Sequence, residues 1–105
     1  GSSVLRDRRV LAEEGVVVVI VGVDIEHGTT MIGPEIVTRG WVHAPEAEDL
    51  LDECAEVVRV AIADLFRNGP SDLENVQRVV RRAAGRFVSD KTKRRPMIVP
   101  VVMEA

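Results

Sequence analysis

The chain has 105 residues, of which 46% are hydrophobic but only 3% aromatic, and its formal net charge is −3 at pH 7. This length predicts one domain with a modest core built from Val, Leu, Ile and Ala. The net charge excludes an evenly polybasic nucleic-acid-binding protein, and the longest apolar run, residues 16–23, is far below the ~20 residues that span a bilayer.

The N-terminal part predicts a short helix followed by a strand. Residues 1–3 are Gly-Ser-Ser without a Met, and we interpret them as a cloning scar that takes no part in the fold. Residues 4–14 mix charged and apolar positions like a short amphipathic helix that Gly15 ends. Residues 16–24, VVVVIVGVD, are almost all β-branched, which favours a strand. Because no polar residue alternates with them, both faces of this strand are expected to be buried.

Residues 31–43 predict a second strand, after a turn in which Gly28 is free to take a positive φ. Pro34 cannot donate a hydrogen bond to a β-ladder, so a bulge or an edge position is expected at Gly33-Pro34.

Two long helices follow. Apolar residues recur with the helix period over residues 45–69 and again over residues 71–93. Ser71 is the predicted N-cap of the second helix, and Glu74 would complete a capping box with it. Gly85 lowers the helix propensity of this segment and therefore indicates close packing against a neighbouring element.

The order of these elements, with a third strand over residues 97–103, predicts an α/β fold, more fully an α+β two-layer sandwich. Its three-stranded mixed sheet has the order 2-1-3, with two long antiparallel helices on one face and a short N-terminal helix. The third strand should run parallel to the first, at an edge that tolerates Pro100.

Two helices cover only one face of such a sheet. The other face keeps half of the apolar side chains of the first and third strands, and each fully exposed Val would forfeit roughly 1.5–3 kcal/mol. The short N-terminal helix could cover part of that face. The remainder predicts a partner, which is a second copy of the chain or another domain of the same polypeptide. The candidate interface residues are Val17, Val19, Val21, Trp41, Met97, Val99, Val101 and Met103.

Catalytic patterns are not recognised in the chain. His27 and His43 are its two histidines and stand in no zinc-binding spacing. Cys54, the one cysteine, falls in the apolar stripe of a helix, where a small buried hydrophobe is the simpler interpretation. A single cysteine excludes an internal disulfide and fits a reducing compartment, and it indicates nothing more specific. The expected location is cytoplasmic.

Charge is distributed unevenly between the two long helices. The first carries mostly acids and the second mostly bases. Two interpretations stand: the helices complement each other side by side, or the bases form a ridge that contacts RNA phosphates without reading sequence. The candidate RNA-contact residues are Arg78, Arg81, Arg82, Arg86, Lys91, Lys93, Arg94 and Arg95.

Several stretches together resemble a known family. They are RRVLAEEGVVVVIVGVD, GPEIVTRGWVH followed by EAEDLLDEC, and the terminal KTKRRPMIVPVVMEA. These resemble the C-terminal domain of ribonuclease J, a metallo-β-lactamase/β-CASP ribonuclease of bacteria. The resemblance covers nearly the whole chain after residue 3, so residues 4–105 are expected to be one such domain.

The resemblance implies that the parent protein is a zinc-dependent hydrolase acting as a 5′-3′ exonuclease and endonuclease in RNA processing and decay. The family's two-zinc site is built by the metallo-β-lactamase domain with help from the β-CASP domain. Those motifs are absent here, so no catalytic residue, metal ligand or cofactor is assigned to this chain. The implied role is to support oligomerisation and docking on the catalytic domains. The implied partners are a second copy, those catalytic domains and RNA, with RNA binding as the alternative function.

Overall fold

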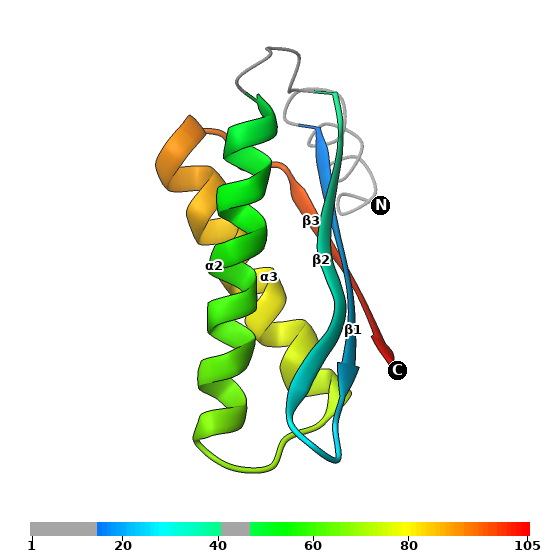
Figure 1. Ribbon diagram of the computed structural model, residues 1–105. Helices are drawn as coiled ribbons and strands as arrows, with labels where there is room; N and C mark the ends of the chain where they lie inside the picture. The colour runs from blue at the N-terminus through cyan, green and yellow to red at the C-terminus, as the bar shows by residue number, and fades with distance from the viewer. Residues whose placement is uncertain (1–14, 41–46) are drawn as a thin grey trace, which may run out of the picture.

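The computed structural model describes residues 15–40 and 47–105, which form two layers, a sheet and a pair of helices (Figure 1). The elements are β1 (Val16–Asp24), β2 (Thr29–Arg39), α2 (Ala47–Arg67), α3 (Leu73–Thr92) and β3 (Met97–Glu104). The strand order is β2-β1-β3, with β1 antiparallel to β2 and parallel to β3. Both helices lie on the same side of the sheet (Figure 1). The predicted mixed sheet, its order and its two-helix layer are confirmed, whereas the predicted helix over residues 4–14 lies outside the described residues.

The core forms between one face of β1 and the two helices. Val17, Val19, Val21 and Val23 have no exposed surface, since alternate residues of a strand point to the same side. They pack with the buried side chains of the helices, which are Cys54, Val58, Ile62, Val76, Val80, Ala84, Phe87 and Val88. The stiff χ1 torsions of these valines favour the strand conformation. The same residues therefore form the β-ladder with their backbone and fill the core with their side chains.

The turn between β1 and β2 is held by Asp24. Its Oδ1 accepts a hydrogen bond from the His27 backbone N–H at 3.0 Å, and its carbonyl accepts one from Gly28 N–H at 2.8 Å. β2 begins at Thr29, two residues before the predicted start, because the ladder continues to the end of this turn.

The predicted irregularity at Gly33-Pro34 is confirmed. The register between β1 and β2 shifts between Ile20 and Gly22, opposite these residues. Gly33 has φ 75°, and a Cβ there would lie 2.6 Å from the carbonyl oxygen of Ile20. Only glycine fits this approach. Residues 41–43, the predicted end of this strand, lie outside the described residues.

The helices start close to their predicted positions, with one correction. Ser71 is not the N-cap of α3; Asp72 is, with extended backbone (φ −136°, ψ 172°) and Oδ1 accepting the Asn75 N–H at 2.8 Å. Ser71 Oγ is instead buried without a hydrogen-bond partner. The predicted capping box with Glu74 is therefore wrong, because the chain enters the helix one residue later. At the other end, Lys93 closes α3 in the left-handed conformation, and its N–H donates to Ser89 O at 2.9 Å.

The close packing predicted for Gly85 is directed at β3. A Cβ added there would lie 3.7 Å from Ile98 Cγ1, which is ordinary van der Waals contact. Gly85 thus lies where α3 packs on β3, but the space there would accommodate a Cβ.

β3 presents Pro100 to the outer edge of the sheet. Met97 N–H donates to Gly15 O, and Ala105 N–H donates to Val23 O. The backbone N–H groups of a strand point alternately toward its two sides. The N–H groups of odd-numbered residues of β3 therefore point toward β1, and those of even-numbered residues point toward the outer edge of the sheet. Pro100 lacks its donor at a position where β1 needs none, which is where an edge strand tolerates proline.

Candidate interaction surfaces

Within residues 15–40 and 47–105, both helices lie on one face of the sheet, and the second face is almost entirely aliphatic in β1 and β3. We call it the open face. The register places Val16, Val18 and Ile20 of β1 beside residues of β2 and β3 that point the same way. The other apolar members of the open face are Ile32 and Val37 of β2, and Met97, Val99, Val101 and Met103 of β3.

Exposed apolar surface on this face concentrates at one end. Ile32 is 54% exposed, Val101 40% and Met103 41%. Ile32 and Met103 both pair with Gly22 of β1. A Cβ on Gly22 would lie 3.1 Å from Ile32 Cβ, so Ile32 occupies the space that the missing side chain leaves.

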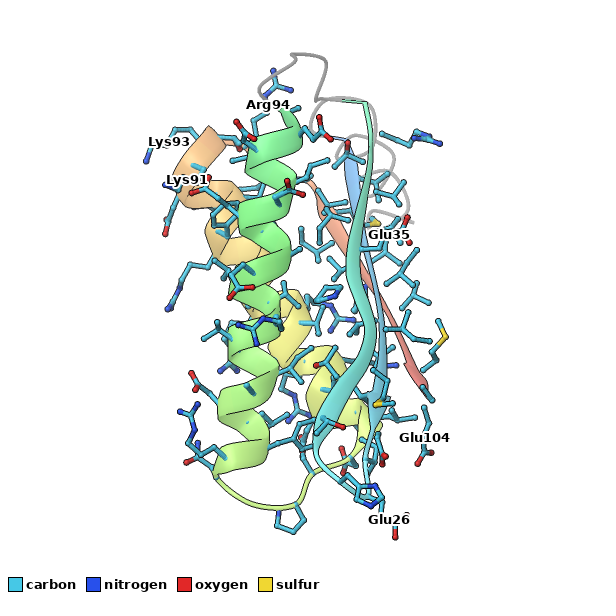
Figure 2. The ribbon with its side chains drawn as sticks, viewed as in Figure 1. Glu26, Glu35, Lys91, Lys93, Arg94 and Glu104 are labelled. Carbon is cyan, nitrogen blue, oxygen red and sulfur yellow. The ribbon has the colours of Figure 1, made fainter. Side chains whose placement is uncertain are left out.

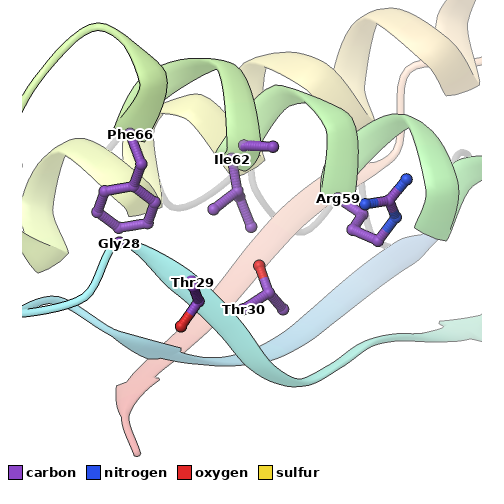
Figure 3. Close-up of a pocket in the computed structure, with 7 residues that line it drawn as sticks. Gly28, Thr29, Thr30, Arg59, Ile62 and Phe66 are labelled. Atoms are coloured by element: carbon purple, nitrogen blue, oxygen red, sulfur yellow. The ribbon is translucent and has the colours of Figure 1, made fainter.

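Met31 joins this group from the bulged start of β2. Thr30, which precedes it, turns toward the helix layer and lines a cavity with Ile62 and Phe66 (Figure 3). Met31, next along the strand, therefore turns to the opposite side, where it is 60% exposed. Its Sδ accepts a hydrogen bond from the Thr29 hydroxyl at 3.7 Å. We call Met31, Ile32, Val101 and Met103 the methionine patch.

Charge borders the open face rather than crossing it. Glu35 pairs in register with Ile20 and is exposed, and Figure 2 shows it pointing away from the helices. Arg39 pairs with Val16 at the far end of β2 and donates from Nη1 to Thr38 O at 3.0 Å. Both belong to the edge strand β2, and the residues of β1 and β3 on the open face are uncharged.

The candidate interface from the sequence is corrected for β1. Val17, Val19 and Val21 are fully buried under the helices and offer nothing to a partner. The outward residues of β1 are their neighbours Val16, Val18 and Ile20. The structure places Met97, Val99, Val101 and Met103 on the open face, as expected, whereas Trp41 lies outside the described residues. Sequence reasoning missed Met31 and Ile32, although two adjacent apolar residues beside Gly33-Pro34 were a signal for a bulged, exposed edge.

The second surface is a basic ridge on α3 and the segment after it. Arg78, Arg82 and Arg86 follow each other at four-residue spacing, which aligns them along a helix. All eight predicted cations are exposed, and Figure 2 shows Lys91, Lys93 and Arg94 at one end of the helix layer. The ridge consists of Arg78, Arg81, Arg82, Arg86, Lys91, Lys93, Arg94 and Arg95.

Among the described residues, ion pairs involve only one cation of this ridge. Arg78 lies 3.8 Å from Glu74 and donates to Asn75 Oδ1 at 3.1 Å. Within residues 15–40 and 47–105, the other seven cations form no salt bridge, and Lys91 lies 6.0 Å from the centroid of the Phe87 ring. Among the same residues, no ion pair links α2 to α3, because the acids of α2 that pair do so with arginines of α2 itself. Direct pairing between the two helices therefore does not account for the ridge.

The cavities and reactive side chains of the described residues are weaker candidates for a functional site than the two surfaces. The cavity of Figure 3, between Thr30 and Phe66, measures about 230 Å³, below the roughly 300–1,000 Å³ of small-molecule sites. Burial raises the pKa of Cys54 to about 11, which keeps its thiol protonated. Across the described part of the chain, no three His, Cys, Asp or Glu side chains could hold a metal ion together. No helix there is long and apolar enough to cross a membrane.

The fold and its surfaces define a small α+β domain whose exposed features are two broad surfaces, one apolar and one basic. The chain belongs to the ribonuclease J C-terminal domain family, whose model matches residues 3–105. Ribonuclease J2 of Bacillus subtilis (strain 168) is 36% identical over 104 residues, which cover 99% of this chain and 19% of that protein. Ribonuclease J 2 of Staphylococcus aureus (strain NCTC 8325 / PS 47) is 38% identical over the same length and shares. The chain thus spans about a fifth of the length of the curated relatives that it matches.

Proposed function

We propose that this chain is the C-terminal domain of a ribonuclease J-like enzyme of RNA processing and decay, and that it supports self-association of the enzyme and docks on its catalytic domains. The family match and the relatives named ribonuclease J2 support the assignment. In this proposal the metallo-β-lactamase and β-CASP domains, their zinc ions and the exonuclease and endonuclease activity belong to the rest of the parent polypeptide. The parent works in the cytoplasm, and this domain acts on catalysis only through the position it gives the other domains.

The observation that carries the proposal is the open face. The four residues of the methionine patch together expose an area equal to about two whole apolar side chains. Burying that area would stabilise a complex by roughly 3–6 kcal/mol per chain, at about 1.5–3 kcal/mol for each side chain. Two identical chains would double this gain.

The cost of association sets the expected strength. Joining two chains loses about 4–15 kcal/mol of translational and rotational freedom, which is similar to the gain from the patch. The isolated domain should therefore associate weakly, in the micromolar range or above, and contacts elsewhere in the parent would strengthen the assembly.

Sedimentation equilibrium of the 105-residue chain tests this proposal. We expect reversible association that changes little with salt, because the patch is uncharged. A strict monomer up to millimolar concentration would contradict self-association. Hydrogen exchange of the parent enzyme then tests docking: the backbone amides of β3 should exchange more slowly in the parent than in the isolated chain. Removing the domain should reduce assembly and RNA degradation by the parent together.

The basic ridge supports a second candidate function, RNA binding. Seven of its cations have no salt bridge within the described residues, so they are available to phosphates without breaking an ion pair. Binding of single-stranded RNA to this ridge should weaken steeply with salt, in contrast to association through the open face. Replacing Arg81, Arg82, Arg94 and Arg95 by Glu should abolish it while leaving self-association intact. No detectable binding of RNA at low salt would exclude this function for the isolated domain.

A further inference from the structure

The sulfur atoms of this chain are divided between two environments. The sequence contains three methionines and one cysteine. All three methionines, Met31, Met97 and Met103, lie on the open face, and Met31 and Met103 are 60% and 41% exposed. The cysteine, Cys54, is 1% exposed within the core. Sulfur that solvent can reach is therefore concentrated on the surface that the proposed function uses.

The two exposed methionines flank the same point of the sheet. Gly22 of β1 pairs with Ile32, the neighbour of Met31, on one side and with Met103 on the other. The space above Gly22 is filled by Ile32, which therefore lies between the strands that carry the two methionines. β2 and β3 lie on either side of β1, and each pair of adjacent strands is about 4.8 Å apart, so the two methionines lie on opposite sides of the patch, about two strand spacings apart.

We propose that the methionine patch is an oxidation-sensitive surface, and that conversion of Met31 and Met103 to sulfoxides by a hydroperoxide releases the self-association of the domain. This inference rests on the proposed function, since it assigns a regulation to the same surface. In the reaction, the thioether sulfur attacks a peroxide oxygen, an S–O bond forms and the O–O bond breaks. The sulfur loses two electrons and the peroxide gains them. The proton of the transferred hydroxyl passes through solvent to the other oxygen, which leaves as water or an alcohol.

The product is the reason that association weakens. A sulfoxide is polar, and burying it against aliphatic side chains leaves a hydrogen-bond acceptor without a partner. A symmetric pair of chains would bury four such groups. We expect the dissociation constant of self-association to rise at least tenfold, and reduction of the sulfoxides by methionine sulfoxide reductases to restore it.

Because Cys54 is buried, peroxide should oxidise the methionines of the methionine patch first. Peroxides attack the thiolate, and burial raises the pKa of the Cys54 thiol to about 11, so little thiolate forms at neutral pH. Partial oxidation should therefore modify Met31 and Met103 before Cys54. Association protects the patch, so the rate of oxidation should also fall as the protein concentration rises.

The test combines peptide mass spectrometry with sedimentation equilibrium before and after treatment with hydrogen peroxide. Wild type should gain oxygen at Met31 and Met103 and dissociate, with its thermal unfolding midpoint nearly unchanged. The double variant M31L/M103L keeps apolar side chains of similar size. Its dissociation constant, measured before treatment as its own reference, should not change after peroxide. M97L is the matched control, because it removes a methionine outside the patch and should remain sensitive.

Each outcome separates this inference from the proposed function. If the untreated chain associates and the verified double sulfoxide associates equally well, the inference is overturned and the proposed function stands. If M31L/M103L loses association to peroxide as wild type does, another site carries the sensitivity and the inference is again overturned. If the untreated chain remains monomeric at every concentration, the proposed function fails and the inference fails with it.

Discussion

Replacing Val101 by serine should weaken self-association of the domain by about 7- to 50-fold. Val101 is 40% exposed and belongs to the methionine patch of the open face, so a partner can bury at most that fraction of it. Full burial of a valine contributes roughly 1.5–3 kcal/mol, which gives about 0.6–1.2 kcal/mol for Val101. A symmetric pair contains the residue twice, and about 1.2–2.4 kcal/mol corresponds to the stated change in dissociation constant.

The matched control for this change is Val60→Ser. Val60 is 43% exposed, nearly the same fraction as Val101, but it lies on α2 in the helix layer. The two variants remove the same atoms from similarly exposed positions, and only one of them belongs to the proposed interface. Sedimentation equilibrium should therefore show weaker association for Val101→Ser and wild-type association for Val60→Ser, with thermal unfolding confirming that each variant is folded.

Two results would refute the reasoning. Equal loss of association in both variants would mean that general surface hydrophobicity, rather than the open face, holds the chains together. Wild-type association in both would place the interface elsewhere, with the helix layer and the basic ridge as the next surfaces to test.

The remaining predictions concern the fold and its titratable groups. Asp72→Ala removes the N-cap of α3 and should lower the free energy of unfolding by about 1 kcal/mol, which lowers Tm by about 4–8 °C. Ser71→Ala should lower Tm less. If calorimetry showed the larger decrease for Ser71→Ala, Ser71 would be the cap. The backbone N–H of His27 and then its ring hold the pKa of Asp24 below its ordinary value. The stabilisation from Asp24 is thus complete above the unfolded pKa and is lost as the pH falls through the lower folded pKa, so Asp24→Asn should flatten urea midpoints over that acidic range. Cys54, with its pKa raised to about 11, should react slowly with iodoacetamide at mildly alkaline pH and rapidly in urea; rapid alkylation of the native chain would contradict its burial.

Much of the fold could be predicted from the sequence because the periodic patterns are strong. Over residues 47–67 and 73–92 the apolar residues follow the helix period, and both helices form there. The parallel placement of β3 beside β1 follows from alternating chain directions once the two helices are recognised. Pro100 then marks β3 as an edge strand, as the structure confirms.

The inward side of β1 could not be predicted in the same way. Residues 16–21 are all aliphatic and β-branched, so the pattern has no polar residue to mark which side faces water. The helix layer decides it by packing on Val17, Val19 and Val21. A shift of one residue would have exposed this set and buried Val16, Val18 and Ile20 instead.

The basic ridge could be predicted from the sequence more completely than the open face. The basic ridge could be named residue by residue, since surface charge needs only helical spacing. Its lack of ion pairs with α2 in the described part of the chain could not be predicted, because two helices of opposite charge suggest pairing. The contribution of Met31 and Ile32 depends on the bulge beside Gly33, whose register only the folded sheet reveals.

Pro100 has a consequence for how copies of this domain can meet. An unpaired edge strand is a template on which other chains can extend a sheet without limit. At the middle of β3 an incoming strand would find no N–H donor and would meet a pyrrolidine ring instead, so growth along the edge is interrupted. In the proposed self-association, copies would then meet through the side chains of the open face, and such contacts would allow closed and reversible pairs. In this way a protein with an exposed aliphatic face can form oligomers with a fixed number of subunits rather than fibres, even at high local concentration.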